Sequence, residues 1–238
     1  MTAALSLRLF SPAGALRSAL PLRRAAARLA ALGFAVEVDE AATARTQRFA
    51  GDDDTRLATL ARVAAARPSI ALATRGGYGM TRLLDRVDWK RIAKSVAAGT
   101  RWVGMSDMTS LQLGLLAHAG GVTWAGPLAC DDFGRSAAEG GVDDVTQGCF
   151  VEAMSGELEA VGFRTEQGFT ASPSAARSGA ATSRSSTRCS RRRTGRASAA
   201  ASSSSRTSTS TRTASSATSC SCTRRACSMR RRRSSSVP

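Results

Sequence analysis

The first 169 residues alternate between two patterns of apolar positions. Short apolar runs, typical of buried strands, occur at residues 6–10, 35–38, 69–73, 101–104 and 122–125. Longer segments rich in Ala, Leu and Arg separate them and have helical character, at residues 16–32, 55–67, 81–87, 89–98 and 108–118. Strands that alternate with helices of this length indicate βαβ units. We therefore predict an α/β fold with a doubly wound, mainly parallel sheet and flanking helices.

Local signals mark the ends of these helices. Gly33 follows the first predicted helix, where a glycine commonly ends the last turn. Three aspartates at residues 52–54 precede the second helix, and carboxylates favour a helix N-terminus. Pro68 ends that helix. A last helix is expected within residues 137–155, and residues 157–164 are typical of the first strand of a further domain.

The composition changes abruptly at Thr170. The last 69 residues contain 22 Ser, 15 Arg and 10 Thr, and they hold no Asp, Glu, Leu, Ile, Phe, Trp or Tyr. They carry +15 of the formal net charge of +16. Such a segment cannot bury enough apolar surface to offset the loss of chain entropy. We predict a domain over residues 1–150, a linker with the start of a second domain over 151–169, and a disordered Arg/Ser-rich tail over 170–238.

Several classes of site and location are disfavoured. Four of the six cysteines lie in the tail, His118 is the only histidine, and no CxxC pair occurs, so neither a zinc site nor a disulfide framework is predicted. No metal and no cofactor are expected. No apolar run approaches the roughly 20 residues of a membrane span, and the N-terminus lacks a signal-peptide pattern. We expect a cytoplasmic protein that binds no membrane. The basic tail lacks interleaved aromatic residues, which argues against specific nucleic-acid binding.

The most informative loop contains Ser106. Parallel α/β sheets bind ligands at the carboxyl ends of their strands, and three loops follow predicted strands there, at residues 11–14, 75–79 and 105–108. In the third, Ser106 lies between a strand and a helix, as a nucleophilic serine does in an elbow turn. Free backbone N–H groups at the helix start could stabilise an oxyanion. The alternative is that Ser106 only caps the N-terminus of the next helix.

The loop Arg75-Gly76-Gly77-Tyr78-Gly79 also allows two interpretations. Glycines after a strand let the backbone approach a ligand or supply an N–H group to an oxyanion. The alternative is a tight turn at the end of a strand. Neither a dinucleotide fingerprint nor a phosphate-binding loop is present. His118 is expected to cap the end of its helix and to point away from Ser106.

Five segments together resemble a known family. They are Phe10-Ser11-Pro12-Ala13-Gly14, Arg48-Phe49-Ala50-Gly51, Arg75-Gly76-Gly77-Tyr78-Gly79, Gly104-Met105-Ser106-Asp107-Met108-Thr109 and Gly126-Pro127. Their order and spacing resemble those of the LD-carboxypeptidases, the serine peptidases of murein recycling that are also called muramoyltetrapeptide carboxypeptidases. The resemblance covers about residues 6–165.

This resemblance implies roles for individual residues. Ser106 matches the family's nucleophile, which works with a Glu and a His from a separate C-terminal domain. The implied reaction is hydrolysis of the bond to the terminal D-alanine of a murein tetrapeptide. The N–H groups of Gly77 and Asp107 are expected to form the oxyanion hole, and Arg75 and Tyr78 are expected to line the substrate crevice. The resemblance leaves open a homodimer, and the family also includes relatives that cleave a peptide-nucleotide antibiotic.

The tail departs from the family, because it contains neither Glu nor His. We interpret it as a C-terminal domain translated in the wrong frame after loss of one base near codon 170. Under this hypothesis, codons for Gly179-Ala180-Ala181-Thr182-Ser183-Arg184 are compatible with the family-like sequence Trp-Gly-Gly-Asn-Leu-Ala in the other frame. Residues 206–217 and 233–238 permit family-like segments in the same way. Activity of the chain would then be impaired. The alternative is a non-catalytic α/β module whose basic tail binds nucleic acid or an acidic partner.

Overall fold

A single parallel sheet organises the computed structural model, which describes residues 4–157. Its strands are β1 (Ser6–Phe10), β2 (Ala35–Val38), β3 (Ile70–Ala73), β4 (Arg101–Gly104) and β5 (Trp124–Ala125). They are ordered β2-β1-β3-β4-β5, and every neighbouring pair is parallel. The chain reverses its direction of winding between β1 and β3. The predicted doubly wound α/β fold is therefore confirmed.

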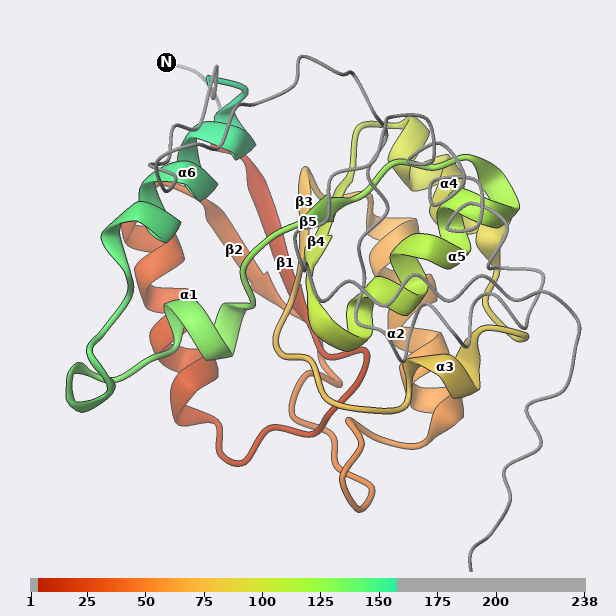
Figure 1. The fold of residues 1–238 in the computed structure, drawn as a ribbon, viewed down its shortest axis with the longest axis horizontal. Coiled ribbons are helices and arrows are strands. Elements are labelled where there is room, and N and C mark those ends of the chain that lie inside the picture. Colours follow the sequence, from red (N-terminus) through yellow and green to blue (C-terminus); the bar gives the residue numbers. More distant parts are fainter. Residues whose placement is uncertain (1–3, 158–238) are drawn as a thin grey trace, which may run out of the picture.

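Helices cover both faces of this sheet (Figure 1). One layer contains α1 (Leu20–Ala31), a short π-helix (Ala129–Phe133) and α6 (Asp144–Ser155). The other contains α2 (Asp53–Ala66), α3 (Met80–Leu83), α4 (Trp89–Ala97) and α5 (Thr109–Ala119). This division follows from the right-handed crossovers of a parallel sheet, which reverse sides where the winding reverses.

The central strand β3 is buried on both of its faces. Ile70 and Leu72 pack into the apolar core beneath α1 and α6, whereas Ala71 and Ala73 pack into the core beneath α2, α4 and α5. The second core also holds Trp102 of β4, whose ring meets that of Phe10 edge to face at 5.3 Å. Alternation along one strand therefore fills two cores, as its continuous apolar run requires.

Some element boundaries differ from the predictions. The first helix begins at Leu20 rather than at residue 16, with Pro21 in its first turn, a position that suits proline. The helix predicted over 81–87 is only the short α3, and Asp88 caps the following helix by accepting from the N–H of Arg91. The edge strand β5 is two residues long. The π-helix was not predicted.

The end of α5 also differs from the expectation. Gly120, in the left-handed conformation, closes the helix by donating its N–H to the carbonyl of Leu116. The prediction that His118 is the capping residue is wrong. Its ring lies instead against Trp89, with 5.0 Å between ring centroids and 11° between ring planes.

Parts of the predicted domain organisation lie outside the described residues. The strand expected over 157–164 and the tail over 170–238 both fall there, so they stay predictions. The expected domain boundary at residue 150 falls inside α6, whose Phe150 and Met154 are buried in the core. None of the helices between residues 4 and 157 has both the length and the apolar character needed to cross a membrane.

Candidate active site

The three loops singled out in the sequence meet at the carboxyl edge of the sheet, the lower edge in Figure 1. The N–H of Gly14, after β1, donates to the carbonyl of Gly76, after β3, at 3.1 Å. The hydroxyls of Ser11 and Thr74 are hydrogen-bonded at 2.7 Å in the same pair of loops. These bonds close the point where the winding reverses, which is the usual position of a ligand crevice in this fold class.

Ser106 lies on the turn between β4 and α5 in a conformation that few residues adopt. Its φ is 62°, in the left-handed region, and its side chain is exposed. A non-glycine residue in this region costs about 1–2 kcal/mol. The N-cap positions of the 3-10 turn Ser106–Met108 and of α5 are Met105 and Met108, and neither helix has a side-chain cap. The alternative in which Ser106 serves as an N-cap is therefore wrong.

Gly76 lies directly against Ser106. A Cβ atom on Gly76 would come within 2.8 Å of both Cβ and Oγ of Ser106, and 3.7 Å from the backbone N of Asp107. Only glycine allows this approach, because real Cβ contacts are longer. The loop of residues 75–79, the glycine loop, thus packs through its backbone against the turn of residues 105–108, the serine turn. The serine hydroxyl and the Asp107 amide nitrogen lie near the same glycine.

Gly77 packs against a different loop from Gly76. Its φ is 121°, and a Cβ on it would lie 3.1 Å from Cα of Gly14. Gly77 therefore packs against the loop after β1, and Gly76 is the glycine that touches Ser106. The sequence signals that two glycines are needed after β3, but not which of them faces which loop. The oxyanion role of Gly77 and Asp107 stays a prediction.

Asp107 fastens the serine turn to the glycine loop from a second side. Its Oδ2 accepts a hydrogen bond from the N–H of Met80 at 2.8 Å. Met80 is the first residue of α3 and follows directly on Gly79. The loop of residues 75–79 is therefore held at both ends, by Gly14 at one end and by Asp107 at the other. The sequence suggested an amide role for Asp107 and missed this carboxylate contact.

Arg75 and Tyr78, both expected to line the substrate crevice, lie in different surroundings. Nη1 of Arg75 donates to the carbonyl of Ala15 at 2.8 Å, and Arg75 lines a cleft of about 500 Å³ beside the π-helix. Tyr78 is 65% exposed and does not line this cleft. Its ring lies 6.0 Å from the guanidinium carbon of Arg48.

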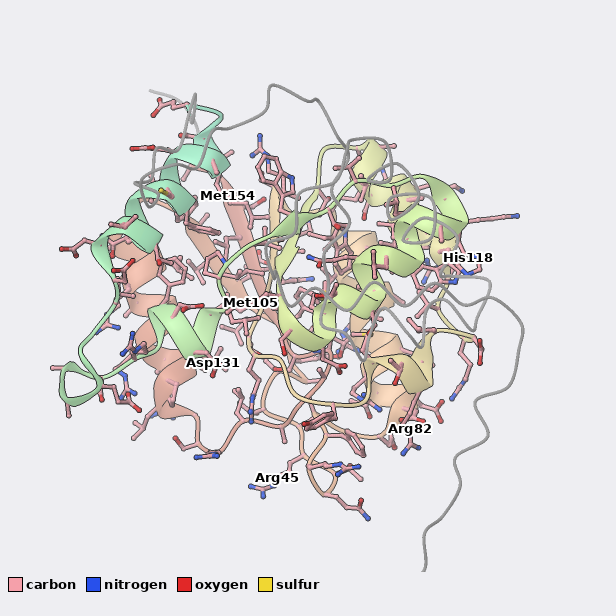
Figure 2. All side chains as sticks on the ribbon, viewed as in Figure 1. Arg45, Arg82, Met105, His118, Asp131 and Met154 are labelled. Carbon is pink, nitrogen blue, oxygen red and sulfur yellow. The ribbon has the colours of Figure 1, made fainter. Side chains whose placement is uncertain are left out.

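Two neighbouring groups at the cleft have raised pKa values. Burial, reinforced by the charge of Asp131, raises the pKa of the Cys130 thiol to about 12, so this cysteine is an inert neutral group at neutral pH. Partial burial also raises the pKa of Asp131, while the positive charge of Arg75 opposes the shift. Figure 2 shows Asp131 beside α1, on the opposite side of the sheet from His118. No motif in the sequence marked these residues.

A buried arginine supports the glycine loop from below. Arg56 of α2 is fully buried, and its Nη2 donates to Asp53. Its guanidinium carbon lies 4.9 Å from the ring centre of Phe49. A Cβ on Gly79 would come within 2.7 Å of both Nη1 of Arg56 and the Phe49 ring. The start of α2 therefore forms the surface on which the end of the loop rests.

No hydrogen bond links the side chain of Ser106 to another residue within residues 4–157. His118 is the only histidine of the chain, and it stacks on Trp89. Within residues 4–157, no three His, Cys, Asp or Glu side chains gather in a way that could hold a metal ion. Within the described residues the site thus consists of an exposed serine hydroxyl and the backbone of two adjoining loops.

Comparison with known proteins supports this description. A family model for the LD-carboxypeptidase N-terminal domain matches residues 7–126. A protein of Streptomyces coelicolor that is named as a carboxypeptidase is 39% identical over 93 residues, which are 37% of this chain and 29% of that protein. The chain thus covers less than a third of this curated relative.

Two solved structures share the fold. The muramoyltetrapeptide carboxypeptidase of Oxalobacter formigenes is 32% identical with a TM-score of 0.54, over 63% of this chain and 48% of that protein. An MccF-like protein of Bacillus anthracis is 24% identical with a TM-score of 0.57, over 65% of this chain and 45% of that protein. The second likeness concerns the fold alone. In both comparisons the chain covers less than half of the other protein.

Proposed function

Because this chain belongs to the LD-carboxypeptidase family, we propose that it carries the nucleophilic domain of a serine carboxypeptidase. The substrate is a murein tetrapeptide, the reaction is hydrolysis of the L,D bond to its terminal D-alanine, and the nucleophile is Ser106. The relative that is 32% identical and named for this activity supports that substrate class. We also propose that the protein works in the cytoplasm, on peptides recovered from the cell wall.

The observation that carries this proposal is the conformation of Ser106. The residue is exposed at the carboxyl edge of the sheet with a φ of 62°, and no helix cap uses its side chain. Strained conformations of this kind persist where the surrounding structure enforces them, and they cluster at active sites. Here Gly76 and Asp107 enforce the turn from two sides. A residue with only a structural role would not need such an arrangement.

The proposed mechanism is acyl transfer in two steps. A base removes the proton of Ser106 Oγ as the oxygen attacks the scissile carbonyl carbon, and the negative charge moves to the carbonyl oxygen. Backbone N–H groups of Gly77 and Asp107 stabilise that oxyanion. The C–N bond then breaks, the base returns its proton to the nitrogen, and D-alanine leaves. Water attacks the acyl-enzyme in the same way and restores Ser106. Arg75 and Tyr78 line the substrate path in this proposal.

The base and the residue that orients it come, in this proposal, from the domain encoded in the other frame after codon 170. A serine hydroxyl without its base is a weak nucleophile. Loss of one triad member typically removes most of the rate enhancement. The chain as it stands is therefore expected to release D-alanine far more slowly than a chain with a complete triad.

Release of D-alanine from a murein tetrapeptide tests this function in three proteins. They are the chain as it stands, the chain with one base inserted near codon 170, and the repaired chain with Ser106→Ala. We expect activity only in the second, with a loss of at least about 10³-fold on Ser106→Ala. Full activity in the unrepaired chain would contradict the frameshift hypothesis. Activity that survives Ser106→Ala in the repaired chain would place the nucleophile elsewhere.

A further inference from the structure

The cleft beside Arg75 has rigid walls. It measures about 500 Å³ and lies between the segment that leads into α1 and the π-helix Ala129–Phe133. Arg24 Nε donates to the carbonyl of Gly134 at 2.7 Å, and Arg28 Nη1 donates to the carbonyl of Phe133 at 2.7 Å. Helix α1 therefore fixes the far wall of the cleft. Pockets of this volume bind small molecules.

Three arginines with no salt bridge line this cleft. Arg17, Arg75 and Arg135 belong to its walls, and none of them pairs with a carboxylate within residues 4–157. Nε of Arg75 is buried and has no hydrogen-bond partner in that part of the chain. Arg135 donates to a backbone carbonyl, that of Glu139. The three arginines outnumber the two carboxylates of the cleft, Asp131 and Glu139, so the cleft carries a net positive charge that favours a carboxylate ligand.

The two acidic residues of the cleft differ in whether their carboxylates accept hydrogen bonds. The carboxylate of Glu139 accepts hydrogen bonds from the N–H and the hydroxyl of Ser136, both at 2.7 Å, within a capping box. Asp131 is exposed at the wall of the cleft, and no hydrogen bond or salt bridge links it to another residue in the described part of the chain. Asp131 is thus an acceptor available to a ligand with a cationic group.

We propose that this cleft binds a free α-amino acid, with its carboxylate at the arginines and its ammonium group at Asp131. Arg17 and Arg135, both exposed, and Arg75, which is partly buried, offer the planar donors that match a carboxylate. The single open carboxylate, Asp131, offers the complementary acceptor. A ligand with both charges on one carbon satisfies both sets, whereas a simple anion leaves Asp131 unpaired and a simple amine faces three cations.

This inference goes beyond the proposed function. Ser106 does not line the cleft, so amino-acid binding needs neither the serine nor a second domain. Binding is accordingly expected in the full chain as it stands, whether or not the repaired chain proves to be a peptidase. Failure of one proposal leaves the other untouched.

Isothermal titration calorimetry on the full chain tests the site with four small probes. D-alanine and L-alanine carry both charges, N-acetyl-D-alanine lacks the ammonium group, and D-alaninamide lacks the carboxylate. We expect saturable binding of alanine in the millimolar range. Each blocked analogue should bind at least about tenfold more weakly, since each leaves one charged partner unpaired. Equal binding of N-acetyl-D-alanine and alanine, or no saturation by alanine, would overturn the proposal.

Two variants with matched controls locate the binding in the cleft. Asp131→Asn and Arg17→Gln should each weaken alanine binding at least about fivefold. Asp144→Asn and Arg23→Gln change exposed residues of α6 and α1 that do not line the cleft, and they should leave binding unchanged. If circular dichroism shows that the Asp131→Asn variant is unfolded, Arg17→Gln and the four probes on the unchanged chain still test whether the cleft binds alanine. Alanine affinity that is unaltered in both cleft variants would refute the site.

Discussion

Two helix starts in this protein are built in opposite ways. Helix α2 begins as local chemistry favours, with the Asp52 side chain accepting from the N–H of Thr55 at 2.8 Å and two further aspartates in the first turn. The turn before α5 begins with Met105 and strained Ser106, and no side chain caps it. The first start is fixed by its own residues, and the second is fixed by Gly76 and Asp107 from outside.

This difference shows that one helix start stabilises the fold and that the other one destabilises it. The start of α2 stabilises the fold locally and also supports Gly79 through Arg56. The serine turn has no side-chain cap and has a strained φ at Ser106, and the hydroxyl of that residue is exposed. Strain at one helix start is therefore offset by the contacts of the other, which is the pattern expected where a reactive group must be held in place.

The largest effect should come from removing the buried guanidinium beneath the glycine loop. Arg56→Ala leaves a cavity and removes the buried partner of Asp53, so we expect a loss of about 3–5 kcal/mol in the free energy of unfolding by urea. The matched control is Arg82→Ala, because Arg82 pairs with the other carboxylate oxygen of Asp53, Oδ2, at 3.0 Å but is 57% exposed. Its loss should stay below about 1 kcal/mol. Similar losses in the two variants would show that burial does not matter here.

A smaller loss should follow from adding one methyl group beside Ser106. Gly76→Ala places a Cβ 2.8 Å from Ser106 Oγ, so the two loops must separate. We expect a loss of about 1–3 kcal/mol in unfolding free energy. Gly148→Ala is the control, since a Cβ at this position in α6 meets nothing within 4 Å and should stabilise the helix by about 0.5–1 kcal/mol. A neutral Gly76→Ala would mean that the close approach is not a constraint.

The strain at Ser106 can be measured with two substitutions that both remove the hydroxyl. Alanine keeps the cost of the left-handed φ, whereas glycine relieves it. After the entropy that glycine adds to the unfolded chain, Ser106→Gly should remain more stable than Ser106→Ala by about 0.5–1 kcal/mol in urea unfolding. The reverse order would argue against stored strain at this turn.

The smallest effect concerns the cap of α2 and depends on pH. The hydrogen bond from the Thr55 N–H lowers the pKa of Asp52 below its usual 3.8. A lowered folded-state pKa gives stability that is present above the unfolded pKa and is lost as pH falls through the folded one. Asp52→Ala should therefore lower the melting temperature at pH 7, and its difference from the parent chain should shrink below about pH 4. Asp52→Asn, which keeps an acceptor, should lose less at pH 7. A difference that grows in acid would contradict this assignment.

Local pattern was sufficient for the sheet and for the position of the serine. The bounds of β1, β2 and β4 match the predicted ones, because each is a short apolar run between turn residues. The turn that holds Ser106 was predicted for a similar reason. Only a short loop separates the strand from the helix there, so the chain has to turn sharply at that point.

Contacts between distant segments could not be predicted in this way. The choice of Gly76 as the neighbour of Ser106 depends on how two loops pack, 30 positions apart in the chain. The cleft at Asp131 depends on a π-helix, whose one extra residue in a turn leaves no periodic signature in five residues. Sequence reasoning thus located the turn that holds Ser106 but not the surface that surrounds it.

The bond between Gly14 and Gly76 has a consequence for the time course of folding. It joins residues 62 positions apart and can form only once β1 and β3 have paired. Long-range closures of this kind are slow compared with helix formation. In a pulse-labelling experiment the Gly14 amide should therefore gain protection from exchange after the amides of α2 do. If Gly14 is protected first, the order is wrong. The serine turn would accordingly be among the last parts of this domain to form, so a newly made chain would have its helices before Ser106 reached its final position.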